Sequence, residues 1–117
     1  MSNSVIGLSI DCADAATLAQ FWANVLGRPV SPQPTAEFAA IDASESTQGP
    51  RLAFHQVPEP KTIKNRLHLD LISGEFAAES ERLLALGATK VNDAAKGAAR
   101  WTTFRDPEGN EFDLVAD

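Results

Sequence analysis

A histidine and a neighbouring aspartate are the side chains of this sequence best placed to do chemistry. In the segment RLHLDLI, leucines alternate with polar residues, so His68 and Asp70 point to one face of a predicted strand. A carboxylate on the same face can orient or protonate an imidazole, which is what a functional histidine requires. The alternative is a hydrogen-bonded sheet histidine that binds no ligand.

Two further candidates lie near the C-terminus. Asp113, in the segment EFDLV, points away from the face that carries Phe112 and Leu114, so it is either a ligand contact or a solvated carboxylate. Trp101 opens a predicted strand and shares a face with Thr103. Its ring could line a cavity as a flat platform for an aromatic ligand, and core packing is the alternative.

The elements that must position these residues form a weak internal repeat: strand, helix, strands, linker, strand, helix, strands. Gly27 and Gly87 are each expected to end a helix, and they are 60 residues apart. Modules of this size would bury too little alone, so we expect them to share one core or to swap with a partner chain. The predicted strands span residues 5–12, 38–41, 51–57, 66–72, 100–105 and 111–115, with a linker at 58–65 and a polar loop at 92–99.

The composition excludes several classes of protein. A chain of 117 residues with 44% apolar and 22% charged residues is typical of one globular domain. Ten Lys and Arg against sixteen Asp and Glu give a scattered net charge of −6, so we expect no nucleic-acid partner. No apolar run approaches the roughly 20 residues that cross a bilayer, so we expect no membrane partner. A lone cysteine and the absence of a charged, apolar leader predict a cytoplasmic protein.

Four segments together resemble the glyoxalase/bleomycin-resistance/dioxygenase superfamily, also called vicinal oxygen chelate proteins: FWANVLG, NRLHLDL, LLALGA and RDPEGNEFDLV. The resemblance spans nearly the whole chain, and VPEPKTIKNRLHLDL is similar to a glyoxalase-like subgroup. It implies an α+β fold of two βαβββ modules, the first at about 1–57 and the second at 66–117. The modules would form an incurved mixed sheet around a ligand cavity, with the helices on the outer side, commonly in a homodimer.

The resemblance also implies a metal site. Enzymes of the superfamily typically bind one divalent ion through the first and last strands of each module, and these positions fall on Gly7, Ala53, His68 and Asp113. Glycine and alanine cannot ligate, so two of the four ligands remain, for zinc, nickel, manganese or iron(II). Zinc sites normally have at least three protein ligands, so an ion would need another residue.

Other side chains could complete such a site, and each has a structural alternative. His55 could ligate after a register shift, or be a surface histidine at a strand end, and Asp11 could ligate or support a turn. Arg66 and Arg105 could hold a carboxylate or phosphate, or face solvent. Cys12 alternates onto an apolar face, which indicates a buried inert thiol. The sequence holds no nucleophile elbow, phosphate-binding loop or dinucleotide fingerprint.

Two functions therefore remain open. The first is binding of a small molecule by His68, Asp70, Trp101 and Asp113 in the cavity, with an incomplete metal site or none. The missing ligands and the charge of −6 favour a metal-free form of it, in which an acidic cavity of a dimer captures a cationic or planar ligand. The alternative is a metal-dependent lyase or dioxygenase using His68 and Asp113, in which the ion polarises adjacent oxygens of a substrate. The sequence does not identify the reaction.

Overall fold

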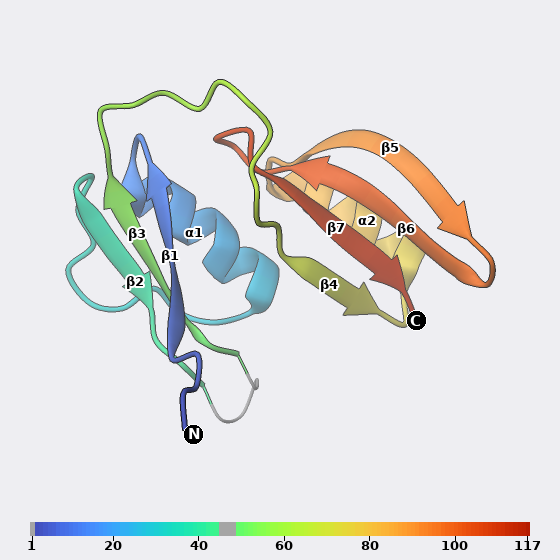
Figure 1. Cartoon of the computed structure of the whole chain (residues 1–117), viewed down its shortest axis with the longest axis horizontal. Coiled ribbons are helices and arrows are strands. Elements are labelled where there is room, and N and C mark those ends of the chain that lie inside the picture. The colour runs from blue at the N-terminus through green and yellow to red at the C-terminus, as the bar shows by residue number, and fades with distance from the viewer. Residues whose placement is uncertain (1, 45–48) are drawn as a thin grey trace. The chain divides into compact units, whose positions relative to one another are not determined.

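The computed structural model describes residues 2–44 and 49–117, which divide into unit 1 (Met1–Pro60) and unit 2 (Lys61–Asp117) (Figure 1). The boundary falls within the segment 58–65. Both units combine a sheet with one helix, and the α+β class and repeated module are confirmed. The elements are β1 Gly7–Cys12, α1 Ala15–Leu26, β2 Phe38–Ile41, β3 Arg51–Gln56, β4 Asp70–Ser73, α2 Phe76–Leu86, β5 Thr89–Lys96, β6 Ala99–Arg105 and β7 Glu111–Ala116.

The helix of unit 1 has clear start and stop signals. Asp14 is the N-cap, and its side chain accepts a hydrogen bond from the Thr17 backbone N–H at 3.2 Å. Gly27 ends α1 in the left-handed conformation, with φ of 64°. The face of α1 against the sheet is fully apolar, with Ala15, Leu18, Ala19, Phe21, Trp22, Ala23 and Val25 buried. Both predicted ends of this helix are confirmed.

The sheet of unit 1 has the order β1-β3-β2, with β1 and β3 parallel and β2 and β3 antiparallel. The segment between α1 and β2 forms no strand because Pro29, Pro32 and Pro34 remove the backbone donors that a ladder needs. The buried Arg28 side chain ties this region together by donating to the carbonyls of Asp42 and Pro50.

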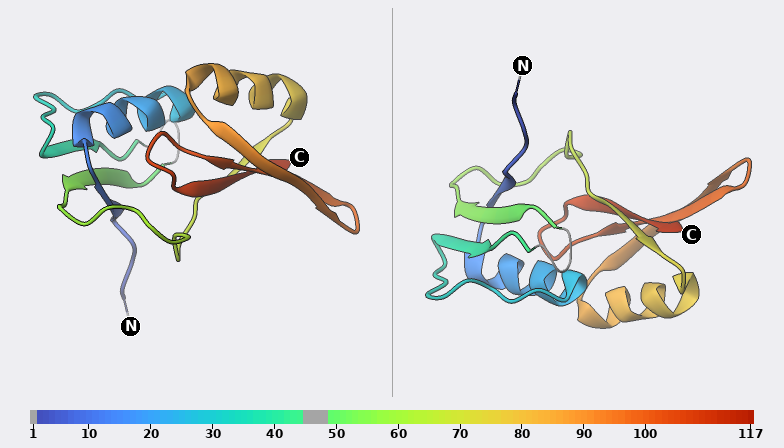
Figure 2. Two further views of the ribbon diagram at one scale, coloured as in Figure 1. Left: turned by 90° about the horizontal axis from the view of Figure 1, so that it is seen from above. Right: turned by 90° about the horizontal axis from the view of Figure 1, so that it is seen from below.

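Unit 2 has the sheet order β4-β7-β6-β5, with α2 against one face (Figure 2). That face holds the core, in which the rings of Phe104 and Phe112 stack at 5.7 Å. Of α2 only Leu83 is fully buried, and Gly87 ends the helix in the left-handed conformation, as the sequence predicts. The opposite face of the sheet carries mixed side chains, with Thr103 and Asp113 beside Trp101 and Val115.

A β-bulge at Val91 sets the directions of side chains in β5. Lys90 pairs with Phe104, whereas Asn92 pairs with Thr103, so β5 contains one more residue than β6 at this point. Without the bulge, side chains three residues apart would point to opposite faces. With it, Lys90 and Asp93 form an ion pair of 2.7 Å on the helix side.

Three sequence predictions about strands are corrected by the structure. β5 occupies most of the predicted polar loop at 92–99, because its pairing with β6 outweighs its weak strand propensity. β1 begins at Gly7 rather than at Val5, and β4 begins at Asp70 rather than at Arg66. Leu67, expected on the apolar face, is instead 83% exposed. Among the described residues, no helix combines the length and apolar character needed to cross a membrane.

Candidate functional site

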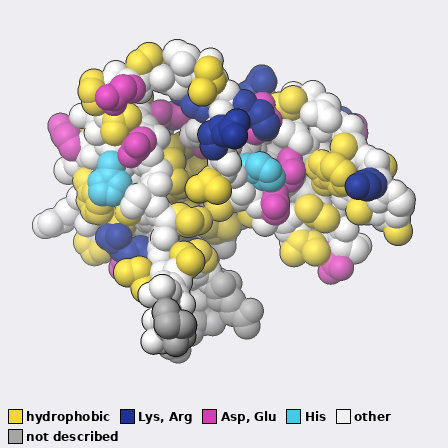
Figure 3. Space-filling model, viewed as in Figure 1, with side chains coloured by type: hydrophobic (Ala, Val, Ile, Leu, Met, Phe, Trp, Pro, Cys, Tyr) yellow, Lys and Arg dark blue, Asp and Glu magenta, His cyan; other side chains and the backbone are white. Residues whose placement is uncertain are grey.

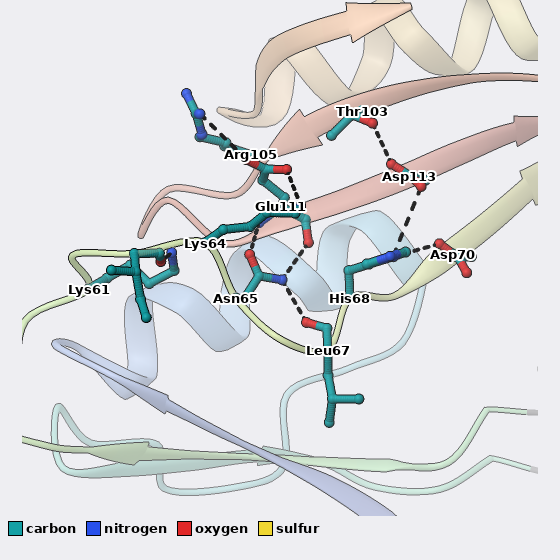
Figure 4. A network of polar contacts seen from close by, with 11 residues as sticks. Lys61, Lys64, Asn65, Leu67, His68, Asp70, Thr103, Arg105, Glu111 and Asp113 are labelled. Atoms are coloured by element: carbon teal, nitrogen blue, oxygen red, sulfur yellow. Dashed lines mark hydrogen bonds and ion pairs between the residues drawn. The ribbon is translucent and has the colours of Figure 1, made fainter. Parts of the chain in front are cut away.

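Three side chains of unit 2 gather on the face of the sheet that α2 does not cover (Figure 4). The Nδ1 atom of His68 lies 2.8 Å from Oδ1 of Asp70 and 4.0 Å from Oδ2 of Asp113. One ligand atom from each of the three residues lies within 4.8 Å of the others. We call these residues the His68 cluster, and it joins three of the four predicted ligand-binding residues.

Pairing in the sheet explains the position of the two carboxylates. Asp113 lies on β7, with Asp70 beside it on β4 and Thr103 beside it on β6. Residues opposite one another in neighbouring strands point to the same face. The Thr103 hydroxyl donates to Oδ1 of Asp113 at 2.6 Å, which orients this carboxylate and leaves Oδ2 towards His68.

His68 lies just before β4, and the Asn65 side chain holds the segment that carries it. Asn65 Oδ1 accepts from the Glu111 backbone N–H at 2.8 Å, and its Nδ2 donates to the carbonyls of Glu111 at 3.0 Å and Leu67 at 2.6 Å. The Asn65 amide is therefore hydrogen-bonded to the N–H and carbonyl of Glu111, the backbone groups with which a longer β4 would pair. This contact is the physical reason that β4 begins late and that Leu67 is exposed.

Cationic side chains surround the carboxylate of Glu111, which precedes the cluster on β7. Lys64 Nζ lies 2.6 Å from Glu111 Oε1, and Arg105 Nη2 lies 3.5 Å from Oε2. The hydrogen bond from Lys64 is the main cause that lowers the pKa of Glu111 below its ordinary value, and the charge of Arg105 acts in the same direction. Glu111 therefore remains ionised at neutral pH.

Trp101, the fourth predicted residue, is not part of the cluster. It pairs with Val115, as Thr103 pairs with Asp113, so the register places it on the same face of the sheet one step further along β6. Its side chain is half-buried. The structure is thus compatible with the predicted platform without showing a ligand contact.

The corresponding positions of unit 1 hold no ligand side chain. Gly7 begins β1, and a Cβ placed there would lie 2.8 Å from the Arg51 carbonyl oxygen, so a longer side chain would require the backbone to move. Ala53 is buried in β3. The sequence predicts ligand side chains in the second module only. At these two positions of unit 1 the ligand side chains are absent, and at Gly7 the backbone also leaves no room for one.

The other candidate residues of unit 1 are His55, Asp11 and Cys12, and in the part of unit 1 that the structure describes none of them lies beside another candidate ligand in an ion pair. The ring of His55 lies 5.1 Å from that of Phe38, at an angle of 61°. Asp11 is exposed on β1, opposite His55 in the ladder, and no ion pair between the two is within 4 Å in the described part of the chain. Cys12 is buried, as predicted, and its thiol lies 3.5 Å from the His55 carbonyl.

Two overlapping hollows lie on the helix side of unit 2, away from the His68 cluster. Their volumes are about 280 and 420 Å³, and both are lined by Phe76, Asp93 and Arg100. The Arg100 guanidinium lies 4.5 Å from the centre of the Phe76 ring. No predicted site residue lines either hollow, so the predicted ligand cavity remains a prediction.

Two residues that support the site were missed by sequence reasoning. Asn65 lies in a polar linker where nothing distinguishes a structural amide from a solvated one. The face of Thr103 could be predicted, since it alternates onto the face of Trp101. Its pairing with Asp113 could not, because the pairing depends on the length of the turn between β6 and β7. The three hydrogen bonds of Asn65 required the structure.

Comparison with solved structures identifies close similarity of fold at low sequence identity. FosX from Listeria monocytogenes, a fosfomycin resistance protein in complex with Mn(II) and 1S,2S-dihydroxypropylphosphonic acid, is 14% identical, with a TM-score of 0.78, over 97% of this chain and 90% of that one. A glyoxalase/bleomycin resistance protein/dioxygenase from Nocardioides is 20% identical, with a TM-score of 0.74, over 99% and 84%. At these identities the likeness concerns the fold alone.

Comparison of the sequence leads to the family. No curated protein matches the chain. The model of the glyoxalase-like domain matches residues 7–115, which include both units and every residue of the His68 cluster. This chain therefore belongs to the glyoxalase-like domain family.

Proposed function

We propose that this protein binds one divalent metal ion through His68, Asp70 and Asp113, and that the ion binds a small molecule through oxygen atoms. The observation that carries the proposal is the convergence of an imidazole and two carboxylates within 4.8 Å on an open face of the sheet. Asp70 supplies the third ligand that the sequence positions alone did not provide. The cluster draws all three side chains from unit 2, so it requires no residue of unit 1.

The donor atoms fit a small divalent ion. Ligand atoms about 2.1 Å from a common ion lie roughly 3 to 3.5 Å apart. The separations of His68 Nδ1 from the two carboxylates, 2.8 and 4.0 Å, are close to this range and need only small side-chain rotations. The bond from Thr103 orients Asp113, as outer partners commonly do for metal ligands.

The chemistry of the donors favours manganese among the candidate metals. Two carboxylates, one imidazole and no thiolate suit a harder ion such as Mn(II) better than zinc, which prefers nitrogen and sulfur. FosX, which has this fold, is described with Mn(II), and this supports the choice. Such an ion would polarise oxygens of its ligand as a Lewis acid, which is the chemistry of a metal-dependent lyase or dioxygenase.

Metal titration tests the proposal. We expect the purified protein, without a histidine tag, to bind one equivalent of Mn(II) in calorimetry, and His68→Ala and Asp113→Asn each to weaken binding at least tenfold. His55→Ala removes the other of the two histidines and is the matched control. Binding weaker than millimolar, or an equal loss in the control, would refute the proposal. It would favour the second candidate, a metal-free binding protein, which the lack of ligands at Gly7 and Ala53 supports.

We also propose that the protein is a cytoplasmic homodimer. β4 is an edge strand of its sheet, and its Ile72 is 68% exposed, while Ile63 and Leu67 nearby in the chain are 73% and 83% exposed. Exposed apolar side chains on an edge strand and in the segment before it favour association with another chain. A monomeric mass in analytical ultracentrifugation at micromolar concentration would contradict the dimer, and fractionation of cells would test the location.

A further inference from the structure

We propose that Lys64 and Arg105 form a subsite for a doubly charged oxyanion, of the phosphate class, carried by the ligand of the His68 cluster. The inference rests on the proposed function for the position of the rest of the ligand.

The charge around Glu111 is opposite in sign to that of the whole chain. Lys and Arg side chains gather beside a histidine on the surface (Figure 3). Lys64 and Arg105 both contact Glu111, so two cations share one carboxylate. Because the whole chain has a net charge of −6, this local excess of positive charge does not follow from the overall composition and is a property of this part of the surface.

Two more cations belong to the same part of unit 2. Lys61 lies near the β6–β7 turn, because a Cβ at Gly109 would be 3.9 Å from its Cγ. Arg66 is exposed and has no ion-pair partner among the residues that the structure describes. With Asp106 and Glu108 of the turn included, these four cations exceed the three nearby carboxylates by one charge, and a divalent ion at the cluster would offset Asp70 and Asp113 as well.

The geometry of the two contacts suits an oxyanion. The Lys64 ammonium contacts one oxygen of the Glu111 carboxylate, and the planar Arg105 guanidinium contacts the other. A phosphate offers more acceptor oxygens than the single Glu111 carboxylate can provide to these donors. In the absence of ligand, Glu111 therefore occupies the position of the anion between Lys64 and Arg105. A doubly charged group can displace the Glu111 carboxylate or bind to the two cations beside it.

The spacing defines the class of ligand. Glu111 and Asp113 are two residues apart on one strand and point to the same face, so their side chains leave the backbone about 7 Å apart. A ligand would thus carry its oxyanion about 7 Å from the oxygen atoms that the metal binds. This is the size of a small phosphorylated or phosphonate-bearing molecule rather than of a polymer.

Titration with inorganic phosphate tests the subsite directly. We would follow backbone amide shifts in 15N NMR spectra, first without metal and then with Mg²⁺, which is diamagnetic. We expect saturable shifts at Lys64, Arg105 and Glu111, and we expect Lys64→Gln and Arg105→Gln each to weaken phosphate binding about fivefold. Glu111→Gln removes the competing carboxylate and should strengthen it severalfold. Lys90→Gln is the control, because Lys90 is paired with Asp93 on the helix side.

The outcomes separate this inference from the proposed function. Saturable phosphate binding that the Lys64 and Arg105 variants weaken supports the subsite, even if no metal binds and the proposed function fails. Metal binding at the His68 cluster without saturable phosphate shifts overturns the subsite alone. An equal loss in the Lys90 control, or acetate binding as strong as phosphate binding, also overturns it, because the excess charge must favour a doubly charged group.

Discussion

Removing the Asn65 side chain should loosen the segment that carries His68 while leaving the metal-binding atoms themselves in place. The amide makes three hydrogen bonds, two to the backbone of Glu111 and one to the Leu67 carbonyl. Asn65→Ala deletes all of them. Because β4 begins only at Asp70, the Asn65 contacts and the hydrogen bond from Asp113 N–H to the Leu69 carbonyl at 3.0 Å hold the stretch between them.

The magnitude follows from these bonds. A net hydrogen bond contributes about 1 kcal/mol, and water can replace part of each at this half-buried site, so we expect a loss of about 2 kcal/mol in the free energy of unfolding. His68 would also become mobile in the metal-free protein. Ordering one residue on binding costs about 1 to 2 kcal/mol, so Mn(II) affinity should fall about tenfold.

Urea unfolding and metal calorimetry on the same samples would measure both effects. Asn92→Ala is the matched control, since the Asn92 amide makes one exposed hydrogen bond of 3.3 Å to the Asp93 carbonyl. It should change the free energy of unfolding by less than about 0.5 kcal/mol and leave metal affinity unchanged. If Asn65→Ala behaves like this control in both measurements, the role assigned to Asn65 is refuted.

Three other changes have defined outcomes. Phe104→Ala should lower the free energy of unfolding by about 3 to 5 kcal/mol, seen as a lower urea midpoint, and a loss below 1 kcal/mol would contradict a packed core in unit 2. Arg82, mainly through its hydrogen bond, lowers the pKa of Glu79 in the folded protein. At pH values above the ordinary pKa of Glu, this pair should add about 0.5 kcal/mol to the free energy of unfolding, and the contribution is lost as the pH falls through the lowered pKa. Glu79→Gln should therefore destabilise the protein at pH 7 but not at pH 2, and an equal effect at both would exclude the pair as the cause. Gly7→Ala should cost about 1 kcal/mol or more in urea unfolding, because its Cβ would meet the Arg51 carbonyl, and a neutral result would show that β1 can shift freely.

Local signals in the sequence determined the helices well. Asp14, Gly27 and Gly87 act at the positions where their chemistry predicts caps and stops. Such features depend on a few neighbouring residues, so alternation and cap chemistry are sufficient to locate them. The faces of β6 and β7 were also predictable, because period-two alternation placed Thr103 on the face of Trp101 and Asp113 on the face opposite Phe112 and Leu114.

Features that depend on distant contacts could not be predicted in this way. The start of β4 depends on the Asn65 amide, which lies 46 residues from Glu111 in the chain. The segment at 92–99 has few strand-forming side chains and becomes a strand because β6 pairs with it. The inclusion of Asp70 in the His68 cluster likewise depends on the parallel pairing of β4 with β7.

The bulge at Val91 bears on how this protein can change in evolution. β5 is the edge strand on the side of the sheet away from β4, and β6 separates it from Asp113, so the register of the cluster does not depend on the length of β5. Deleting Val91 would reverse the side chains on one flank of the bulge and break the pair of Lys90 with Asp93, yet it would leave the pairing of Thr103 with Asp113 intact. Single-residue insertions and deletions at this edge can therefore reshape the helix-side surface while the opposite face keeps its chemistry.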